Sequence, residues 1–469
     1  MGIHDNFFEL GGHSLLAIQL ISNISKVFDV NFSVKLLFLQ PTIAEQAEWL
    51  QNHQAPQTET APSSVMTTHQ QKVPNLSNVQ IESRSLFSLF KQGELEPVDS
   101  VALGYMPNAT LEKFDAKYDE MIKIFSGDHR CHFSDMMTTA WGRIGIIMLP
   151  YLDSQLYNDQ ESLVQDIVDA LHMAKEIGAK SVSLTGLIPS ATNYGQAVLQ
   201  KVAHCADLPS ITTGHGTTSS AVVLNIARIL QESGRTLETE RVGFIGLGSI
   251  GLTTLRLMLQ CLPHPQTILL CDVYAKSDFL HRIQQELVQE LNFQGEIQIT
   301  PAKAALPAEI YSSTLIVGAT NVPDVLDITQ VQPGTLIVDD SAPHCFSAPM
   351  AIKRFQKQRD ILFTEGGVIQ SPQPFQYTTH YPPELAERLS LAQFLGDFLL
   401  DSVSITGCVF SSLLSASFGL PSTIGIVKAK DALQHYHLLS ELGFQGSQLH
   451  CEGYVLPQEA IEKFRHHFG

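Results

Sequence analysis

The sequence predicts an α/β protein. We expect a small helical N-terminal domain, then two α/β domains, one of them a Rossmann-type doubly wound parallel sheet, and a mostly helical C-terminal segment. Three observations lead to this fold class: a polar stretch follows the first fifty or so residues, a strand–glycine–helix pattern lies near the middle, and short apolar strands alternate with amphipathic helices. The expected boundaries are 1–51, 52–84 (linker), 85–235 (α/β substrate-binding domain), 236–378 (Rossmann domain) and 379–469.

Composition and charge restrict the function classes. The chain has 469 residues, 44% of them hydrophobic, and a formal net charge of −18, whereas a nucleic-acid-binding protein needs a basic face. Its seven cysteines show no CxxC spacing, which favours thiols in a reducing compartment over a disulfide framework or a metal site. No apolar run of 18 residues and no signal peptide are found, so we expect a cytoplasmic protein without a membrane span, a nucleic-acid partner or a metal.

The first domain begins with a well-marked helix start. Residues 5–16 read DNFFELGGHSLL, and apolar residues then recur with helical spacing up to Phe28. Ser14 lies at the N-cap or first helical position, after two glycines that permit a tight turn. An isolated serine at such a place is usually only a cap. Residues 52–84 are rich in Gln, Thr, Ser, Pro and Asn, which predicts a linker too polar to bury a core.

The region after the linker alternates strands with helices, as parallel sheets require. The expected elements are a strand over 142–149 that ends at Pro150, a helix over 161–178, a strand and loop over 181–193, a polar turn and helix over 211–230, and strands over 313–317 and 335–339. The two most informative motifs lie within this region.

The first motif is a glycine loop between a strand and a helix. Residues 241–259 read RVGFIGLGSIGLTTLRLML, with a buried strand over 242–245. The loop residues are Gly246, Gly248, Ser249, Ile250 and Gly251. Glycines in this context let the backbone approach a pyrophosphate, which rests on the helix N-terminus. The motif predicts a dinucleotide site.

An acidic residue follows the next strand. Residues 267–271 read TILLC and end at Asp272, 21 residues beyond Gly251, where a ribose-binding carboxylate is expected. Asp272 favours NADH, while Lys276 is near enough in sequence to assist a 2′-phosphate. The sequence therefore leaves NADPH and NADH both open as the cofactor.

The stretch DNFFELGGHSLL resembles the phosphopantetheine-attachment motif of peptidyl carrier domains in nonribosomal peptide synthetases. The resemblance implies that Ser14 carries a covalent 4′-phosphopantetheine, installed by a phosphopantetheinyl transferase and loaded through upstream synthetase modules. Carrier domains of this type have a further helix before the motif, and this sequence begins only a few residues upstream. We therefore expect a truncated carrier domain, at the tail of a larger synthetase, in a truncated gene or in an excised piece.

Residues 130–425 resemble the cyanobacterial long-chain acyl-carrier-protein reductases, which form aldehydes. The resemblance rests on GRIGIIMLPYL (142–152), AKEIGAKSVSLTGL (174–187), TTGHGTTSSA (212–221), TLIVDDSAP (335–343), TEGGVIQ (364–370) and TGCVFSSLL (406–414). It implies that Cys408 is the nucleophile that takes the acyl group. Judged from the residues alone, Cys408 is as well explained as a small buried hydrophobe in an apolar helix.

Two histidines are candidates to assist Cys408. His215, within TTGHGTT, is the better placed to lower the thiol pKa or to protonate an oxyanion, and His344 is the other candidate. A structural role for either histidine stays open. Three nearby threonines, Thr213, Thr217 and Thr218, supply hydroxyl donors or simply cap helices.

These observations together favour reductive release. A carrier-bound acyl or aminoacyl thioester passes to Cys408, and a nicotinamide cofactor reduces it to a free aldehyde. One alternative is a tailoring dehydrogenase that reduces an imine or ketone still tethered at Ser14, which does not require Cys408. A second alternative is a non-catalytic docking or scaffold module.

Overall fold

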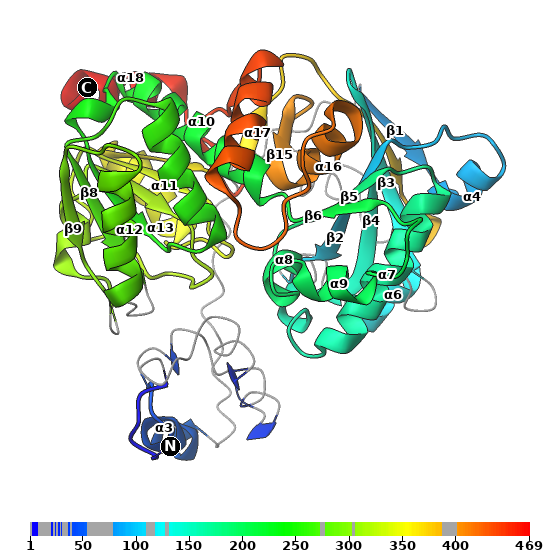
Figure 1. The fold of residues 1–469 in the computed structure, drawn as a ribbon, viewed down its shortest axis with the longest axis horizontal. Coiled ribbons are helices and arrows are strands. Elements are labelled where there is room, and N and C mark those ends of the chain that lie inside the picture. Colours follow the sequence, from blue (N-terminus) through cyan, green and yellow to red (C-terminus); the bar gives the residue numbers. More distant parts are fainter. Residues whose placement is uncertain are drawn as a thin grey trace. The chain divides into compact units, whose positions relative to one another are not determined.

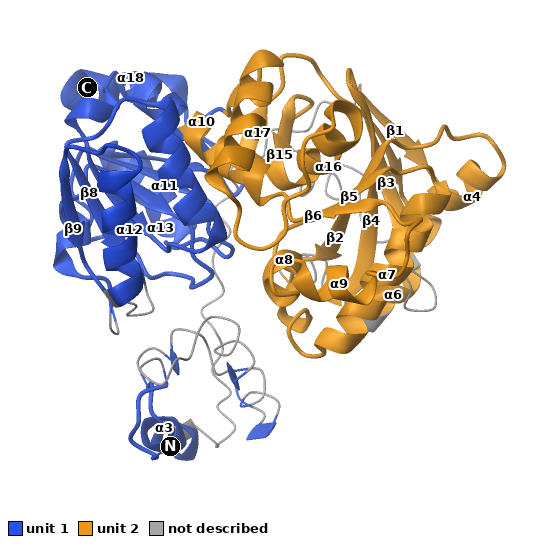
Figure 2. Cartoon of the chain, in the orientation of Figure 1, with its two compact units in different colours: residues 1–71, 226–366, 448–469 blue, residues 72–225, 367–447 orange. Residues whose placement is uncertain are grey.

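The structure is a computed structural model, and it describes only part of the chain. The described residues are 2–7, 20–21, 24, 27–28, 30, 36–37, 40–53, 78–108, 118–126, 131–272, 277–302, 305–386 and 401–469. They divide into two compact units, the first containing 1–71, 226–366 and 448–469 and the second 72–225 and 367–447 (Figure 2). Ser14, Lys276 and residues 54–77 of the expected linker lie outside the described residues. The end of the expected linker was wrong, because residues 79–82 form a strand that pairs within a sheet.

The N-terminal part contains a helix with a well-formed start. Helix α3 (Ile43–His53) follows Thr42, whose hydroxyl accepts from the Glu45 backbone N–H at 3.3 Å while the Glu45 carboxylate accepts from the Thr42 backbone N–H at 3.0 Å. This reciprocal pair satisfies two N–H groups at the helix start. Described side chains of a small apolar cluster are Ile24, Leu37 and Leu50.

The first unit contains the expected doubly wound sheet. Its six strands are all parallel and run in the order β12-β11-β10-β7-β8-β9. The strands are β7 (Arg241–Ile245), β8 (Thr267–Cys271), β9 (Glu296–Ile299), β10 (Leu315–Gly318), β11 (Thr335–Asp339) and β12 (Ile361–Glu365). The chain starts at β7, winds outward to β9 and returns to β10 beside β7, so the carboxyl ends of β7 and β10 flank the switch point where dinucleotides bind.

Helices α11 (Ser249–Cys261) and α12 (Ser277–Gln289) cross in front of this sheet in Figure 1, and α13 (Ala348–Gln358) links β11 to β12. The inner strands are mainly apolar and buried, as LIVG of β10 is, which is expected for a sheet covered on both faces, whereas β9 (EIQI) is more polar and partly exposed. The short hairpin β17 (His450–Cys451) and β18 (Tyr454–Val455) and helix α18 (Gln458–Phe468) complete the unit.

The second unit is built on a mixed sheet of seven strands in the order β1-β14-β3-β4-β2-β5-β6. They are β1 (Val79–Glu82), β2 (Ser100–Met106), β3 (His132–Thr139), β4 (Gly142–Leu152), β5 (Ser181–Leu184), β6 (Ser210–Thr212) and β14 (Gln376–His380). A small sheet adds β13 (Val368–Gln370), β15 (Ser404–Thr406) and β16 (Gln445–Gly446).

The described helices of this unit are α4 (Leu86–Lys91), α6 (Tyr118–Ser126), α7 (Gln160–Glu176), α8 (Ile188–Ala191), α9 (Gln196–Lys201), α14 (Pro383–Ala386), α16 (Gly407–Phe418) and α17 (Ala429–Glu441); α10 (His215–Ser233) begins here. Helix α16 packs on strands β2 and β5. Its apolar residues Phe410, Leu413 and Leu414 join a core that includes Phe444 and Ile144.

The structure divides the C-terminal region differently from the expected boundaries. We expected 379–469 to form one mostly helical segment, but residues up to 447 belong to the second unit and residues from 448 to the first. Helix α16 packs on the mixed sheet, whereas the Arg465 guanidinium of α18 donates to the Glu232 carbonyl oxygen at 2.7 Å. Helical periodicity reveals an apolar face but not the sheet that this face covers.

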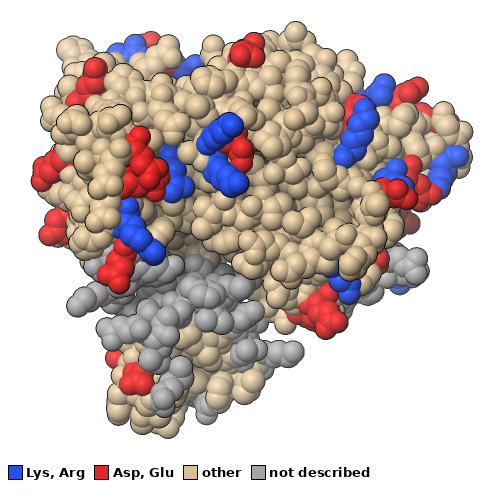
Figure 3. Space-filling view, in the orientation of Figure 1, with Lys and Arg blue, Asp and Glu red and all other residues tan. Residues whose placement is uncertain are grey.

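On the face shown in Figure 3, basic and acidic side chains lie next to one another among uncharged residues. Among the described residues, some charged side chains are paired, such as Arg256 with Glu286 at 2.6 Å. No helix in the described part of the chain is long and apolar enough to cross a membrane.

Candidate functional site

The glycine loop joins β7 to α11 as expected. Gly246 has φ +86°, and a Cβ there would lie 2.5 Å from the Ala319 carbonyl oxygen. A Cβ on Gly251 would collide with the Gly246 carbonyl oxygen. Gly248 is the N-cap of the 13-residue helix, whose first two residues are Ser249 and Ile250. The three glycines thus keep the loop free of side chains at their own positions, next to a helix N-terminus, which fits a pyrophosphate.

Asp272 lies directly after β8, at the same edge of the sheet as the glycine loop. The side chain is buried, and its Oδ2 atom is 3.4 Å from the backbone nitrogen of Leu247 within the loop. The carboxylate is therefore beside the position that the adenosine ribose takes in dinucleotide-binding sheets. The structure brings the loop residues and Asp272 together at one edge of the sheet, and they fit a dinucleotide, whereas Lys276 lies outside the described residues.

Cys408 is the second residue of α16, a helix of 12 residues with Thr406 at its N-cap. Its sulfur is half-buried and lies 3.6 Å from the Thr406 hydroxyl oxygen. The Ser183 hydroxyl of β5 donates to the Cys408 carbonyl oxygen at 2.5 Å, which fixes the first turn of the helix on the sheet. A thiolate in the first turn of a helix is stabilised by the helix dipole.

A second helix start contacts this one. Gly214, just before α10, has φ +74°, and a Cβ there would lie 2.7 Å from the Cys408 Cα atom. A Cβ on Gly407 would lie 3.0 Å from the Thr217 carbonyl oxygen. The N-terminal turns of α10 and α16 are therefore in backbone contact, because glycine occupies both crossing points. Two helix N-termini next to one thiol form a region that favours negative charge.

His215 follows Gly214 and is the first residue of α10. Its ring is buried and packs edge-on against Tyr194 with the ring centroids 5.8 Å apart. Burial lowers the pKa of His215 to about 4, so the ring is neutral near pH 7. A neutral ring does not supply the positive charge that we considered for lowering the Cys408 pKa, and its role in proton transfer stays a prediction.

The threonines beside His215 fix the start of α10. The Thr213 hydroxyl donates to the Thr423 carbonyl oxygen at 3.0 Å, and the Thr217 hydroxyl lies 2.8 Å from Nδ1 of His435 on α17. His435 is a buried partner that the sequence analysis missed, since only the fold brings it to this turn. These contacts give Thr213 and Thr217 structural roles.

His344, the other candidate histidine, lies in the first unit after β11. Its Nδ1 atom is 2.9 Å from Asp339 Oδ2. Burial by itself would lower the pKa of His344, but hydrogen bonds to Asp339 and Cys451 outweigh burial and raise it to about 11. Cys408 belongs to the second unit, so His344 and Cys408 are parts of separate units.

Buried histidines make the second unit sensitive to acid. Burial lowers the pKa of His132 to about 3 and that of His435 to about 4, as it does for His215. Between about pH 6.5 and pH 4 the unfolded chain binds protons that the folded chain does not, so the free energy of unfolding falls as the pH falls. We expect the melting temperature of the second unit to drop over this range.

The variant His435→Gln tests this pH dependence. Its amide keeps a hydrogen-bonding group near Thr217 but does not titrate. Its melting temperature should fall less steeply between pH 6.5 and pH 4 than that of the wild type, in parallel thermal melts. Identical slopes in the two proteins would show that His435 is not buried in its neutral form.

The described units define a class: an α/β protein with a Rossmann-type sheet and a second α/β unit that presents a cysteine at a helix start. The N-terminal segment is of another kind. Residues 1–50 match the family model described as "Phosphopantetheine attachment site". This match confirms the carrier assignment that the DNFFELGGHSLL motif predicted for the segment containing Ser14.

The named relatives are peptide synthetases. The chain is 52% identical over 50 residues to tyrocidine synthase 3 of Brevibacillus parabrevis, which covers 11% of this chain and 1% of the relative. It is 50% identical over 54 residues to gramicidin S synthase 2 of Aneurinibacillus migulanus, covering 12% of this chain and 1% of the relative. The chain thus spans about 1% of the length of these curated relatives.

Two solved structures align with much of the chain, both at low TM-scores. L-tryptophan dehydrogenase from Nostoc punctiforme aligns with a TM-score of 0.32 and 11% identity, over 79% of this chain and 87% of that one. Shikimate 5-dehydrogenase from Listeria monocytogenes, in complex with shikimate and NAD, aligns with a TM-score of 0.29 and 11% identity, over 71% of this chain and 96% of that one. The strand order given above, rather than these alignments, defines the fold.

Proposed function

We propose that the chain releases a carrier-bound acyl or aminoacyl group as a free aldehyde, by reduction of its thioester with NADH or NADPH. The group is carried on 4′-phosphopantetheine at Ser14, which a phosphopantetheinyl transferase modifies and upstream synthetase modules load. The carrier segment and the proposed reductase are parts of one chain, and such tethering raises the local substrate concentration to the order of millimolar.

The position of Cys408 is the observation that carries this proposal. A half-buried thiol is held in the first turn of α16, against the first turn of α10, by backbone contacts at Gly214 and Gly407. A cysteine that merely fills a core needs neither partial exposure nor two helix N-termini around it. The other half-buried thiols are Cys131, which precedes β3, and Cys261, the last residue of α11.

Each residue at this site has a defined task in acyl transfer. The Cys408 thiolate attacks the thioester carbonyl carbon, the bond from that carbon to the pantetheine sulfur breaks, and the pantetheine thiolate leaves and takes up a proton. Exchange between two thioesters is nearly balanced in energy, so a thiol suits this step. The N-terminal N–H groups of α10 and α16 stabilise the negative charge that develops on the carbonyl oxygen.

The first unit supplies the cofactor site. Gly246, Gly248 and Gly251 would leave room for the pyrophosphate at the start of the helix that begins with Ser249 and Ile250, and Asp272 would accept from the ribose hydroxyls. When bound, a reduced nicotinamide supplies the hydride that converts the acyl group to an aldehyde. Because Asp272 accepts from a 2′-hydroxyl and repels a 2′-phosphate, we expect NADH to be preferred.

Product analysis tests the proposal. The full chain, loaded with an acyl-phosphopantetheine at Ser14, is given NADH or NADPH in separate reactions and analysed by mass spectrometry of protein and products. We expect loss of the acyl mass and appearance of a free aldehyde, faster with NADH. Retention of the acyl group with a gain of two mass units would instead identify a tailoring dehydrogenase, and no binding of either nucleotide would indicate a scaffold module.

A further inference from the structure

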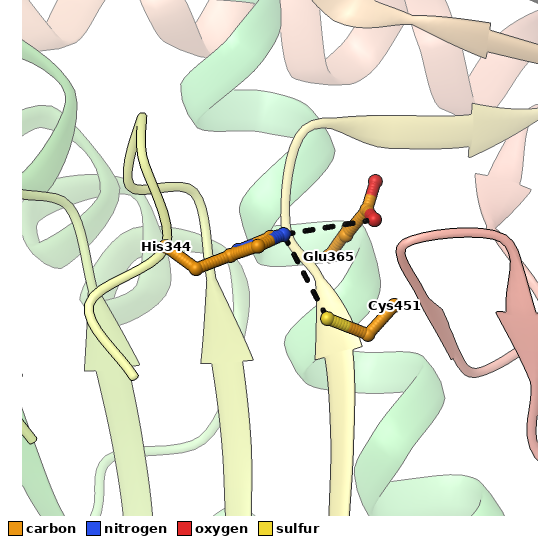
Figure 4. Close-up of side chains that lie close together, drawn as sticks. All are labelled: His344, Glu365 and Cys451. Carbon is orange, nitrogen blue, oxygen red and sulfur yellow. Dashed lines mark hydrogen bonds and ion pairs between the residues drawn. The ribbon is translucent and has the colours of Figure 1, made fainter. Parts of the chain in front are cut away.

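A cluster of metal-ligating side chains lies in the first unit, apart from the glycine loop and from Cys408. His344, Glu365 and Cys451 point toward one another, and one ligand atom from each lies within 4.8 Å of the others (Figure 4). They come from three separate places: the loop after β11, the last residue of β12, and β17. We propose that this cluster binds a zinc ion.

Two of the distances between ligand atoms are close to those of tetrahedral ligation. Nε2 of His344 is 3.7 Å from Sγ of Cys451 and 3.9 Å from Oε1 of Glu365. Zinc bonds of about 2.0–2.3 Å in a tetrahedron put neighbouring ligand atoms roughly 3.3–3.7 Å apart. Because the three ligand atoms all lie within 4.8 Å of one another, movements of these side chains would bring them onto one ion. A thiolate, an imidazole and a carboxylate are the ligands that zinc takes, whereas Mg²⁺ and Ca²⁺ take oxygen ligands.

The imidazole of His344 is oriented as metal-bound imidazoles are. Its Nδ1 atom lies 2.9 Å from the Asp339 carboxylate, which also accepts backbone N–H groups from Ser341 at 3.2 Å and Cys345 at 3.1 Å. That carboxylate is an acceptor, so Nδ1 carries a proton. Zinc would displace the other ring proton from Nε2, whose lone pair then faces the cluster. A carboxylate on the far nitrogen fixes the tautomer and raises the basicity of the ligand.

Glu365 is also held in place by its surroundings. Oε1 accepts from the Glu452 backbone N–H at 2.8 Å, and Oε2 lies 3.4 Å from Nε2 of His450. Nδ1 of His450 lies 2.7 Å from the Gln448 carbonyl oxygen, which only accepts, so this nitrogen is the donor. His450 is therefore a close neighbour of the Glu365 carboxylate and is not one of the three proposed ligands. Three protein ligands leave one position of a tetrahedral ion for water or another ligand.

The ion would connect the hairpin to the sheet. Cys451 comes from β17, and the other two ligands follow or end the paired strands β11 and β12, in which Asp339 is directly opposite Glu365. Cys451 is almost fully buried, whereas the His344 and Glu365 side chains are 20% and 24% exposed, so the ion has access from one side. The site lies at the same carboxyl edge of the sheet as the glycine loop, on the other half of the strand order.

Metal analysis tests this proposal, on the full chain purified without a chelator. The measurement does not depend on enzymatic activity. We expect about one zinc per chain in the wild type and in the control Cys261→Ser, and a loss of at least about tenfold in Cys451→Ser. Asp339→Asn, which keeps all three ligands, should weaken zinc binding by about 10- to 100-fold. Zinc-free wild type, or undiminished zinc in Cys451→Ser, would overturn the proposal.

Cobalt substitution covers the case in which Cys451→Ser does not fold. Wild-type chain stripped by a chelator and titrated with Co²⁺ should show the intense visible bands of a tetrahedral site and a sulfur-to-cobalt charge-transfer band in the near ultraviolet. The weak spectrum of hydrated Co²⁺ at all ratios would contradict a zinc site. Because neither readout involves aldehyde formation, the zinc site and the proposed function can fail separately.

Discussion

Replacement of Cys408 by serine is expected to lower the rate of aldehyde formation by at least about 1,000-fold, because a hydroxyl at this position lacks the thiol's nucleophilicity. The two side chains have nearly the same shape, and the Ser183 contact involves the Cys408 backbone, so α16 should keep its place on the sheet. Nicotinamide binding, measured by fluorescence titration, should remain unchanged since the glycine loop belongs to the other unit.

The matched control is Cys205→Ser, which removes an exposed thiol from the same unit. It should form aldehyde at the wild-type rate. Undiminished aldehyde formation in Cys408→Ser would remove the nucleophile role. It would instead favour direct reduction of the pantetheine thioester.

Gly251→Ala is expected to weaken cofactor binding by at least about tenfold, which corresponds to about 1.4 kcal/mol. An added Cβ would overlap the Gly246 carbonyl oxygen and lie 3.2 Å from the Ala319 Cβ atom, so the loop must open and α11 must move away from β7. Overpacking of this kind costs about 1–3 kcal/mol.

The control for this substitution is Gln260→Ala, at an exposed position of the same helix. Fluorescence titration with NADH measures affinity, and a thermal melt checks that both variants are folded. Wild-type affinity in folded Gly251→Ala would mean that the loop does not bind the pyrophosphate in the way that we infer.

Much of the first unit was predictable because its signals are local. The strand expected over 335–339 matches β11, and the strand over 267–271 matches β8. A buried parallel strand is a short apolar run, and the glycine loop follows β7 directly in sequence. Asp272 was predictable for the same reason, since its distance from the loop along the chain is set by one helix and one strand.

The strand expected to end at Pro150 shows where local reasoning was wrong. Strand β4 continues through Pro150 to Leu152. Its pairing with β3 stops at Met148, and its register with β2 shifts between Gly104 and Met106. A proline is tolerated beside such an irregularity because no ladder hydrogen bond depends on its missing N–H.

Contacts between segments that lie far apart in the chain could not be predicted from the sequence. Gly214 touches Cys408 although 194 residues separate them, and the zinc-site ligands come from positions 344, 365 and 451 without any recognisable spacing. The seven scattered cysteines led us to expect no metal site, because motif spacing reveals only ligands close together in the chain. Both clusters depend on strand order, which no local pattern specifies.

The most direct test of the account is to trap the acyl group on the enzyme. The full chain is incubated with an acyl-pantetheine thioester in the absence of any nicotinamide, digested, and analysed by peptide mass spectrometry, with Cys408→Ser in parallel. We predict the acyl mass on the peptide containing Cys408, and its disappearance when NADH is added together with release of aldehyde. Aldehyde formation without any acyl adduct at Cys408 would contradict the central claim.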